Sequence, residues 1–191
     1  NLYACSGNMG PPAEGVTPVP SAMYVFDLKT GAYKAHYPLP TAGAACNDSA
    51  VDASGTRYVT DTTNMLVATL KPNGEKFEVW AGQDGKFGPT GGVLDGLAVV
   101  DGNLYVNALI TSKLFVVPIG ADGAAGAVAE VTLDKPLDRP DGMRTYGKGL
   151  LVAQGGGAGS LQHVTLDGAT GTNVTLKEGF PDGPVAVTVV G

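Results

Sequence analysis

The sequence places an oxygen-bearing side chain at the start of an apolar segment four times, at nearly equal intervals. The successive intervals are 48, 46 and 41 residues, between Asn47, Asp95, Asp141 and Asp182. Recurrence at this period indicates repeats of one supersecondary unit. If the units are arranged radially, the starts of the apolar segments meet at one axis, and so do these four side chains.

The chain between these positions is rich in short strands and tight turns. One interval shows the pattern clearly, with strands expected over 49–52, 57–61, 65–70 and 76–80 and a hairpin signal at Asn73-Gly74. The next interval is expected to end in a strand over 127–133. The chain has 29 Gly, 13 Pro and only 16% charged residues, which favours an all-β fold. Four antiparallel strands in each interval predict the blade of a β-propeller. A β-sandwich is the less favoured alternative, because it does not repeat a four-stranded unit in phase.

We therefore predict one all-β domain, a β-propeller of about four blades. If the two ends of the chain are joined, Gly191 followed by Asn1-Leu2-Tyr3 has the same sequence as Gly102-Asn103-Leu104-Tyr105. The C-terminal strand, 184–190, is therefore expected to be the innermost strand of the first blade, beside residues 1–6. Such a join would close the ring and protect two open edges. The predicted blades are 184–191 with 1–40, 41–83, 84–136 and 137–183.

The net charge and the hydropathy of the chain argue against two classes of binding partner. The net charge is −6 and there is no basic stripe, so nucleic acid is not an expected partner. No apolar run approaches the roughly 18 residues that a membrane span needs, so no membrane partner is expected. Asn1 to Cys5 do not resemble a signal peptide. The acidic balance mildly favours a bound cation, and the oligomeric state is left open.

The chain has two cysteines, Cys5 and Cys46, and no Cys-x-x-Cys spacing. A zinc ribbon or a thioredoxin-type motif is therefore absent. A disulfide and a pair of isolated buried thiols both fit this count, which does not fix the compartment. A secreted or periplasmic location is favoured over a cytoplasmic one.

The four recurring side chains suit a hard divalent cation at the mouth of the propeller. In a propeller the first strand of each blade lines the central channel, so these side chains would face a shared position. Carboxylate and amide oxygens are ligands for Ca²⁺ or Mg²⁺. Carboxylates crowded together without a cation would repel one another and raise their pKa values. The alternative is that each of these residues only shapes a tight turn at the start of a strand.

The same positions carry a resemblance to a known family. The order Asn47-Asp48-x-x-Val51-Asp52, then Asp95-Gly96-Leu97, then Pro140-Asp141-Gly142-Met143 resembles the motifs of the regucalcin/gluconolactonase family of β-propellers. Asp182-Gly183-Pro184-Val185 resembles the family's Glu-Gly-Pro-Val motif, although it stands at the other end of the chain. Aspartate replaces asparagine at position 95 and glutamate at position 182. The family ring has six blades, so this chain resembles a shortened relative or a part of a larger ring.

The resemblance implies a function. It implies that Asp95, Asp141 and Asp182 hold a divalent cation, with Ca²⁺ as first choice and Mg²⁺ or Zn²⁺ as alternatives. It also implies that Asn47 contacts substrate or water and that Asp141 is the general base. The implied activity is a metal-dependent hydrolase that opens a lactone or related ester, such as a sugar lactone.

Two further residues are candidates for substrate contact, and a second class of function is open. Glu14 lies on a Pro-rich loop, 8–20, whose ends reach the predicted mouth, and Asn107 ends a second strand on the same side. The alternative function is a non-catalytic binding module or scaffold, with a structural ion or none. An open coordination position facing solvent would favour the enzyme over the binding module.

Overall fold

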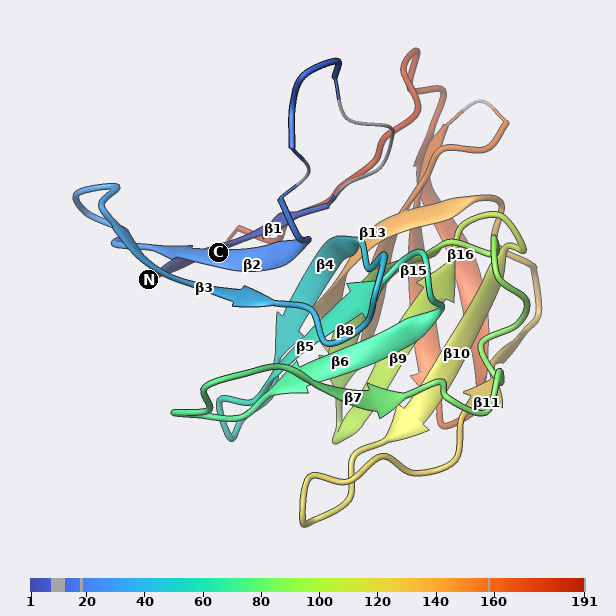
Figure 1. Ribbon diagram of the computed structural model, residues 1–191. Helices are drawn as coiled ribbons and strands as arrows, with labels where there is room; N and C mark the ends of the chain where they lie inside the picture. Colours follow the sequence, from blue (N-terminus) through green and yellow to red (C-terminus); the bar gives the residue numbers. More distant parts are fainter. Residues whose placement is uncertain (8–12, 18, 158, 191) are drawn as a thin grey trace.

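The structure is a computed structural model that describes residues 1–7, 13–17, 19–157 and 159–190. These residues form strands and loops and contain no helix (Figure 1). No helix in them could therefore cross a membrane. The strands form four separate sheets, each built mainly from neighbouring segments of the chain.

The first two sheets are simple antiparallel meanders. The first has the order β1-β2-β3 and consists of β1 (Leu2–Ser6), β2 (Ala22–Phe26) and β3 (Tyr33–Pro38). The second has the order β4-β5-β6-β7 and consists of β4 (Cys46–Val51), β5 (Arg57–Asp61), β6 (Leu66–Leu70) and β7 (Glu78–Ala81).

The third and fourth sheets share the segment that the sequence predicted as one strand, 127–133. The third sheet has the order β11-β10-β9-β8, from β8 (Leu94–Val100), β9 (Asn103–Ala108), β10 (Lys113–Pro118) and β11 (Ala129–Glu130). The fourth has the order β12-β16-β15-β14-β13, from β12 (Thr132–Leu133), β13 (Pro140–Tyr146), β14 (Gly149–Gln154), β15 (Ser160–Asp167) and β16 (Thr170–Glu178). The predicted strand therefore divides between two sheets at Val131.

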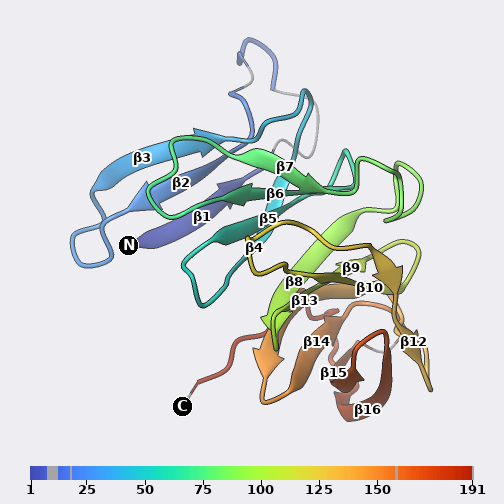
Figure 2. The ribbon, with the colours of Figure 1, turned by 90° about the horizontal axis from the view of Figure 1, so that it is seen from below.

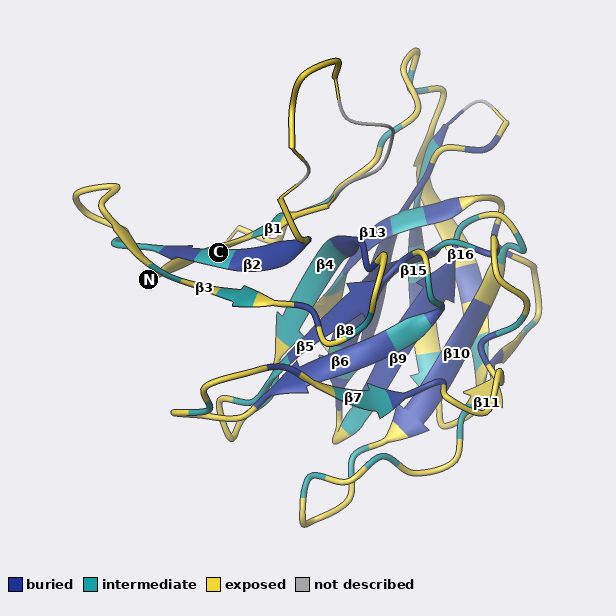
Figure 3. Cartoon of the chain, viewed as in Figure 1, coloured by how far each residue is buried: buried dark blue, intermediate teal, exposed yellow. Residues whose placement is uncertain are grey.

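The four sheets follow one another in an arc, with β1, β4, β8 and β13 on the inner side (Figure 2). Each pair of successive sheets encloses its own apolar core. Met23 and Phe77 belong to the core between the first and second sheets. Tyr58 and Phe115 belong to the next core, and Tyr105 and Met143 to the third. Figure 3 shows the result, with the deepest burial in the strands of the middle sheets and exposed residues on the outer loops.

A disulfide bridge joins Cys5 of β1 to Cys46 of β4. Of the two alternatives that the sequence left open, the structure therefore has the bridge, and no free cysteine remains. The bridge connects the first sheet to the second at the inner side of the arc. A backbone bridge between Gly7 and Ala45 reinforces the same junction.

Ring closure by the C-terminal strand is not confirmed. Residues 184–190 form no strand, and β1 pairs with β2 alone among the strands of the described chain. No apolar cluster of the described residues joins the fourth sheet to the first. The C-terminal segment instead runs beside β13, where the Gly142 backbone N–H donates to the Val185 carbonyl oxygen at 3.0 Å. The architecture shown is therefore an all-β, propeller-like arrangement of about four sheets.

Candidate active site

The starts of β4, β8 and β13 carry the same irregularity in their pairing. In each of the three strands, one extra residue is inserted directly after the first pair of the ladder. A bulge of this kind bends the strand and turns a side chain in a new direction, and it is common beside active sites. The bulged residues are Asn47-Asp48 in β4, Asp95-Gly96 in β8 and Asp141-Gly142 in β13. Three of the four recurring side chains therefore lie in bulges within strands, and not in turns between them.

Glycine follows the aspartate in two of these bulges because a neighbouring segment of the chain is too close for a side chain. A Cβ atom on Gly96 would lie 2.5 Å from the Asp141 carbonyl oxygen. A Cβ atom on Gly142 would lie 2.8 Å from the Val185 carbonyl oxygen. Gly96 thus permits the close approach of β8 to β13 that brings Asp95 and Asp141 together, and Gly142 permits the approach of the C-terminal segment to β13.

Asp95 and Asp141 form a carboxyl pair at this point. Burial is the main cause that raises the pKa of Asp95 to about 7, and the negative charge of Asp141 adds to it. Burial also raises the pKa of Asp141, although its bond from the Gly142 N–H, 2.9 Å long, acts in the opposite direction. A hydrogen bond between the two side chains raises the pKa of Asp95 and lowers that of Asp141. The pair therefore holds a proton more readily than two isolated aspartates would, because the pKa values of both carboxyls are raised.

Asn47 and Asp48 complete the cluster from β4. The Asn47 side chain forms a hydrogen bond with Asp95 that lowers the pKa of that carboxyl. The Asp48 carboxylate is held by Arg144, whose Nη1 and Nη2 donate to its two oxygens at 2.7 and 3.1 Å. The charge of Asp48 still raises the pKa of both Asp95 and Asp141.

Two buried polar side chains hold the bulged strands in register. The Thr60 hydroxyl donates to the Asp95 carbonyl oxygen at 2.8 Å, and it accepts the Asp48 backbone N–H at 3.1 Å. Asn107 has no exposed surface. Its Nδ2 donates to the Asp141 carbonyl oxygen at 2.6 Å, and its Oδ1 accepts the Gly96 N–H at 3.1 Å. This burial does not support the predicted contact of Asn107 with substrate, and gives Asn107 a positioning role.

The other predicted site residues do not join the cluster. Asp182 is exposed on the segment after β16, and Glu14 is exposed in a turn. In the part of the chain that the structure describes, no hydrogen bond or ion pair links either side chain to Asp95 or Asp141. The same part contains no group of three or more His, Cys, Asp or Glu side chains that could hold a metal ion. The predicted ring of four ligands is therefore not assembled, although Asp95, Asp141 and Asn47 together offer hard oxygen donors.

Sequence reasoning missed Asp48, Arg144 and Thr60 as parts of the cluster. Asp48 stands in the bulge position that Gly96 and Gly142 occupy in the next two sheets. An aspartate where the other repeats have glycine could have indicated that Asp48 belongs to the cluster. Arg144 gives no such signal, since it lies 96 residues from its partner Asp48.

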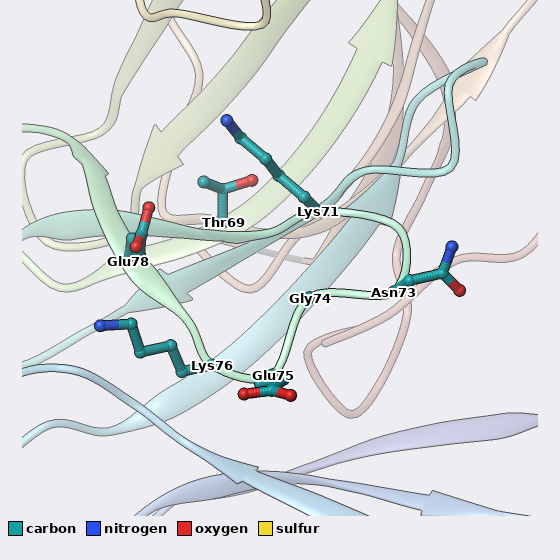
Figure 4. A pocket seen from close by; sticks show the side chains of 7 residues that line it. All are labelled: Thr69, Lys71, Asn73, Gly74, Glu75, Lys76 and Glu78. Atoms are coloured by element: carbon teal, nitrogen blue, oxygen red, sulfur yellow. The ribbon is translucent and has the colours of Figure 1, made fainter.

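A surface hollow elsewhere on the molecule does not compete with this cluster. It lies on the β6–β7 hairpin and is shown in Figure 4. Lys71, Glu75 and Lys76 line it, and their side chains extend in different directions without converging on one point. The hollow therefore lacks the convergent polar groups of a binding site.

Solved structures of β-propeller proteins are similar to this chain in fold. Virginiamycin B lyase from Staphylococcus aureus matches with a TM-score of 0.65 and 15% identity, over 86% of this chain and 52% of that one. A gluconolactonase from Xanthomonas campestris matches with a TM-score of 0.63 and 20% identity, over 87% and 58%. Regucalcin from Agrobacterium tumefaciens, described as a calcium-binding protein, matches with a TM-score of 0.56 and 16% identity, over 76% and 51%.

At these identities the likeness shows the fold alone. The chain matches about half to three fifths of the length of each of these structures. The sequence matches no protein-family model and no curated protein.

Proposed function

We propose that the protein is a hydrolase that opens a lactone or a related ester, with a sugar lactone as the class of substrate. The reaction would take place where the bulges of β4, β8 and β13 meet. The observation that carries the proposal is the Asp95–Asp141 pair, in which Asp95 is buried and its pKa is raised to about 7. Two carboxyl groups whose environments give them different protonation states form a common acid–base arrangement. The likeness in fold to a gluconolactonase supports the same class of reaction.

The roles of the residues follow from their protonation and hydrogen bonds. The hydrogen bond of the pair acts to lower the pKa of Asp141, so we assign Asp141 as the general base that takes a proton from the attacking water. Without a bound cation, Asp95 holds a proton near neutral pH and can return it to the leaving oxygen. With a cation bound, Asp95 would be an ionised ligand, and Asp141 would pass the proton that it took from water to the leaving oxygen. Asn47 already forms a hydrogen bond with Asp95, and its amide would orient the water or the substrate.

A divalent cation belongs to this proposal, with Ca²⁺ first and Mg²⁺ or Zn²⁺ as alternatives. Asp95, Asp141 and Asn47 would hold it, and Asp182 would have to move from its exposed position to join them. Such a cation, when bound, polarises a carbonyl oxygen and lowers the pKa of a bound water. The raised pKa values of Asp95 and Asp141 support it, because a positive charge relieves the repulsion that contributes to them.

A binding module without catalysis is the second candidate. It is favoured because the described residues contain no group of three or more His, Cys, Asp or Glu side chains that could hold a metal ion. In that case Asp95 and Asp141 are a satisfied pair that fixes the inner strands. Lactone turnover separates the two candidates directly.

We also propose a secreted or periplasmic location. The Cys5–Cys46 bridge supports it, because disulfides persist in oxidising compartments.

The test is hydrolysis of an aldonolactone, followed by acid release at constant pH with Ca²⁺ or with a chelator. We expect Asp141→Asn to lower kcat about 100-fold or more, because it removes the base. Asp101→Asn is the matched control, because it removes the same charge from an exposed turn between β8 and β9. Equal turnover by wild type and Asp141→Asn, or no turnover of any lactone by the wild type, would reject the hydrolase in favour of the binding module.

A further inference from the structure

A second hollow lies along the inner strands, beyond the bulges. It has a volume of about 360 Å³, which is near the lower end of the range for small-molecule sites. Its walls are β4, β8 and β13 and the C-terminal segment, through residues such as Ser49, Leu97, Thr145 and Thr188. The C-terminal segment passes along this side of the arc in Figure 2.

The charged residues that line this hollow are all cationic. Arg57 and Arg144 both line it, whereas no Asp or Glu does. This is unusual in a chain with 12 basic and 18 acidic residues. Asp48 neutralises Arg144 by an ion pair at 2.7 Å. The hollow therefore keeps about one uncompensated positive charge, which belongs to Arg57.

Arg57 is held in place without a carboxylate partner. Its guanidinium carbon lies 3.2 Å from the centre of the Tyr3 ring, so a cation–π contact fixes it. Within the residues that the structure describes, no ion pair involves Arg57. A guanidinium that is oriented by a ring and lacks a counter-charge is suited to bind an oxyanion with two parallel hydrogen bonds.

Hydroxyl groups and apolar surface complete the lining. Ser49, Thr145 and Thr188 contribute hydroxyls, and the Thr145 hydroxyl already donates to the Val99 carbonyl oxygen at 2.8 Å. Its oxygen can still accept a bond from a ligand. Leu97 and Ala98 also line the hollow, although both are buried and their side chains belong to the cores on the two faces of the third sheet. A small ligand that combines an anionic group with hydroxyls matches this lining.

We propose that this hollow is a binding site for a small oxyanion, either the carboxylate of a sugar acid or inorganic phosphate. Arg57 provides the charge, and the hydroxyls of β4, β13 and the C-terminal segment surround the remainder of the ligand. The site is separate from the Asp95–Asp141 pair and goes beyond the proposed hydrolysis, since it does not require that reaction.

The test is isothermal titration calorimetry of the whole chain at low ionic strength with sodium gluconate, with inorganic phosphate and with neutral methyl glucoside. We expect the wild type to bind at least one of the two anions and not the glucoside. Arg57→Gln should weaken binding about tenfold or more, because it removes a charge-assisted pair of hydrogen bonds. Arg57→Lys, which keeps the charge but loses the planar fork, should weaken binding less.

Two controls make the outcome decisive. Lys86→Gln removes one positive charge from an exposed loop away from the hollow, so it should leave the affinity unchanged. Asp141→Asn should retain anion binding, even if it abolishes lactone hydrolysis. Binding of gluconate alone assigns the site to a sugar acid, and binding of phosphate as well assigns it to small oxyanions in general. The proposal is overturned if neither anion binds, or if Arg57→Gln and Lys86→Gln have the same effect.

Discussion

Burial and a neighbouring charge act together on Asp95. Burial and the Asp141 carboxylate both oppose its ionisation, which raises its pKa from an ordinary 3.8 to about 7. The folded chain therefore binds more protons than the unfolded chain between these two values. By linkage, this carboxyl stabilises the fold below about pH 4, and its contribution is lost as the pH rises to about 7.

We predict a pH dependence of stability that Asp95→Asn removes. With a chelator present, the melting temperature of the wild type should fall between pH 4.5 and pH 7.5, because Asp95 must ionise in a buried place. Asp141 adds to the same slope, since its pKa is raised too. Asp95→Asn should flatten the slope, and Asp101→Asn should not. Parallel curves for the wild type and Asp95→Asn would show that Asp95 titrates normally.

A second prediction concerns Asp48, whose charge raises the pKa of both paired carboxyls. Asp48→Asn removes this charge, so the pKa of Asp95 should fall while burial keeps it above 3.8. Carboxyl carbon chemical shifts, followed by NMR across a pH titration, measure this directly. Asp122→Asn, on the exposed turn between β10 and β11, is the control that should leave the Asp95 titration unchanged. An unchanged Asp95 pKa in Asp48→Asn would mean that Arg144 fully screens Asp48.

At the scale of the element, the inner strands show what sequence patterns can and cannot predict. The strand predicted over 57–61 has the same bounds as β5. Asn47, Asp95 and Asp141 stand second in β4, β8 and β13, so their position at strand starts is confirmed. The bulges were not predicted, because an inserted residue becomes visible only once the partner strand is known. The Asp48–Arg144 pair depends in the same way on contacts between distant strands.

The segment 127–133 shows how tertiary contacts override a continuous pattern. The Val131 N–H donates to the Leu114 carbonyl oxygen of the third sheet, whereas the Thr132 N–H donates to the Ala169 carbonyl oxygen of the fourth. Because adjacent residues bond to different sheets, one apolar run becomes two short strands. Sequence periodicity carries no information on such a change of partner.

The close approach of β8 to β13 gives a prediction at this scale. Gly96→Ala would place a Cβ atom 2.5 Å from the Asp141 carbonyl oxygen and 2.9 Å from Asn107 Nδ2. We expect a loss of about 1–3 kcal/mol in the free energy of unfolding, measured by urea titration, because the strands must move apart. Gly155→Ala is the matched control, because its Cβ atom would meet nothing within 4 Å. Equal stability of the two variants would show that the inner strands are not closely packed.

At the scale of the whole molecule, the first sheet depends on few connections. It shares one apolar core with the second sheet, and no described cluster joins it to the fourth. The Cys5–Cys46 bridge therefore has a large share in holding it. The sequence predicted an all-β fold of about four sheets, because most strands pair with a neighbour in the sequence. The path of 184–190 was not predictable, since a Val-rich segment pairs with any available edge and the Gly142–Val185 contact decides its place.

We predict that the double variant Cys5→Ser/Cys46→Ser lowers the stability of the first sheet more than that of the other three sheets. The bridge spans 41 residues, and a loop of that length stabilises a fold by about 3–4 kcal/mol. Hydrogen exchange should become faster in β2 and β3, while β9 and β14 keep their protection. The oxidised wild type is the reference. A uniform loss of protection in all four sheets would show that the arc unfolds as one cooperative unit.

The shared bulge of β4, β8 and β13 has a consequence for how this molecule can change. Each bulge directs one side chain to the common site, while the residues after it continue into the apolar cores. Chemistry at positions 47, 95 and 141 is thus largely uncoupled from the packing that maintains the sheets. A combinatorial library at these three positions would sample new reactivities while the sheets keep their packing. Natural substitutions at the same positions can change the chemistry in the same way.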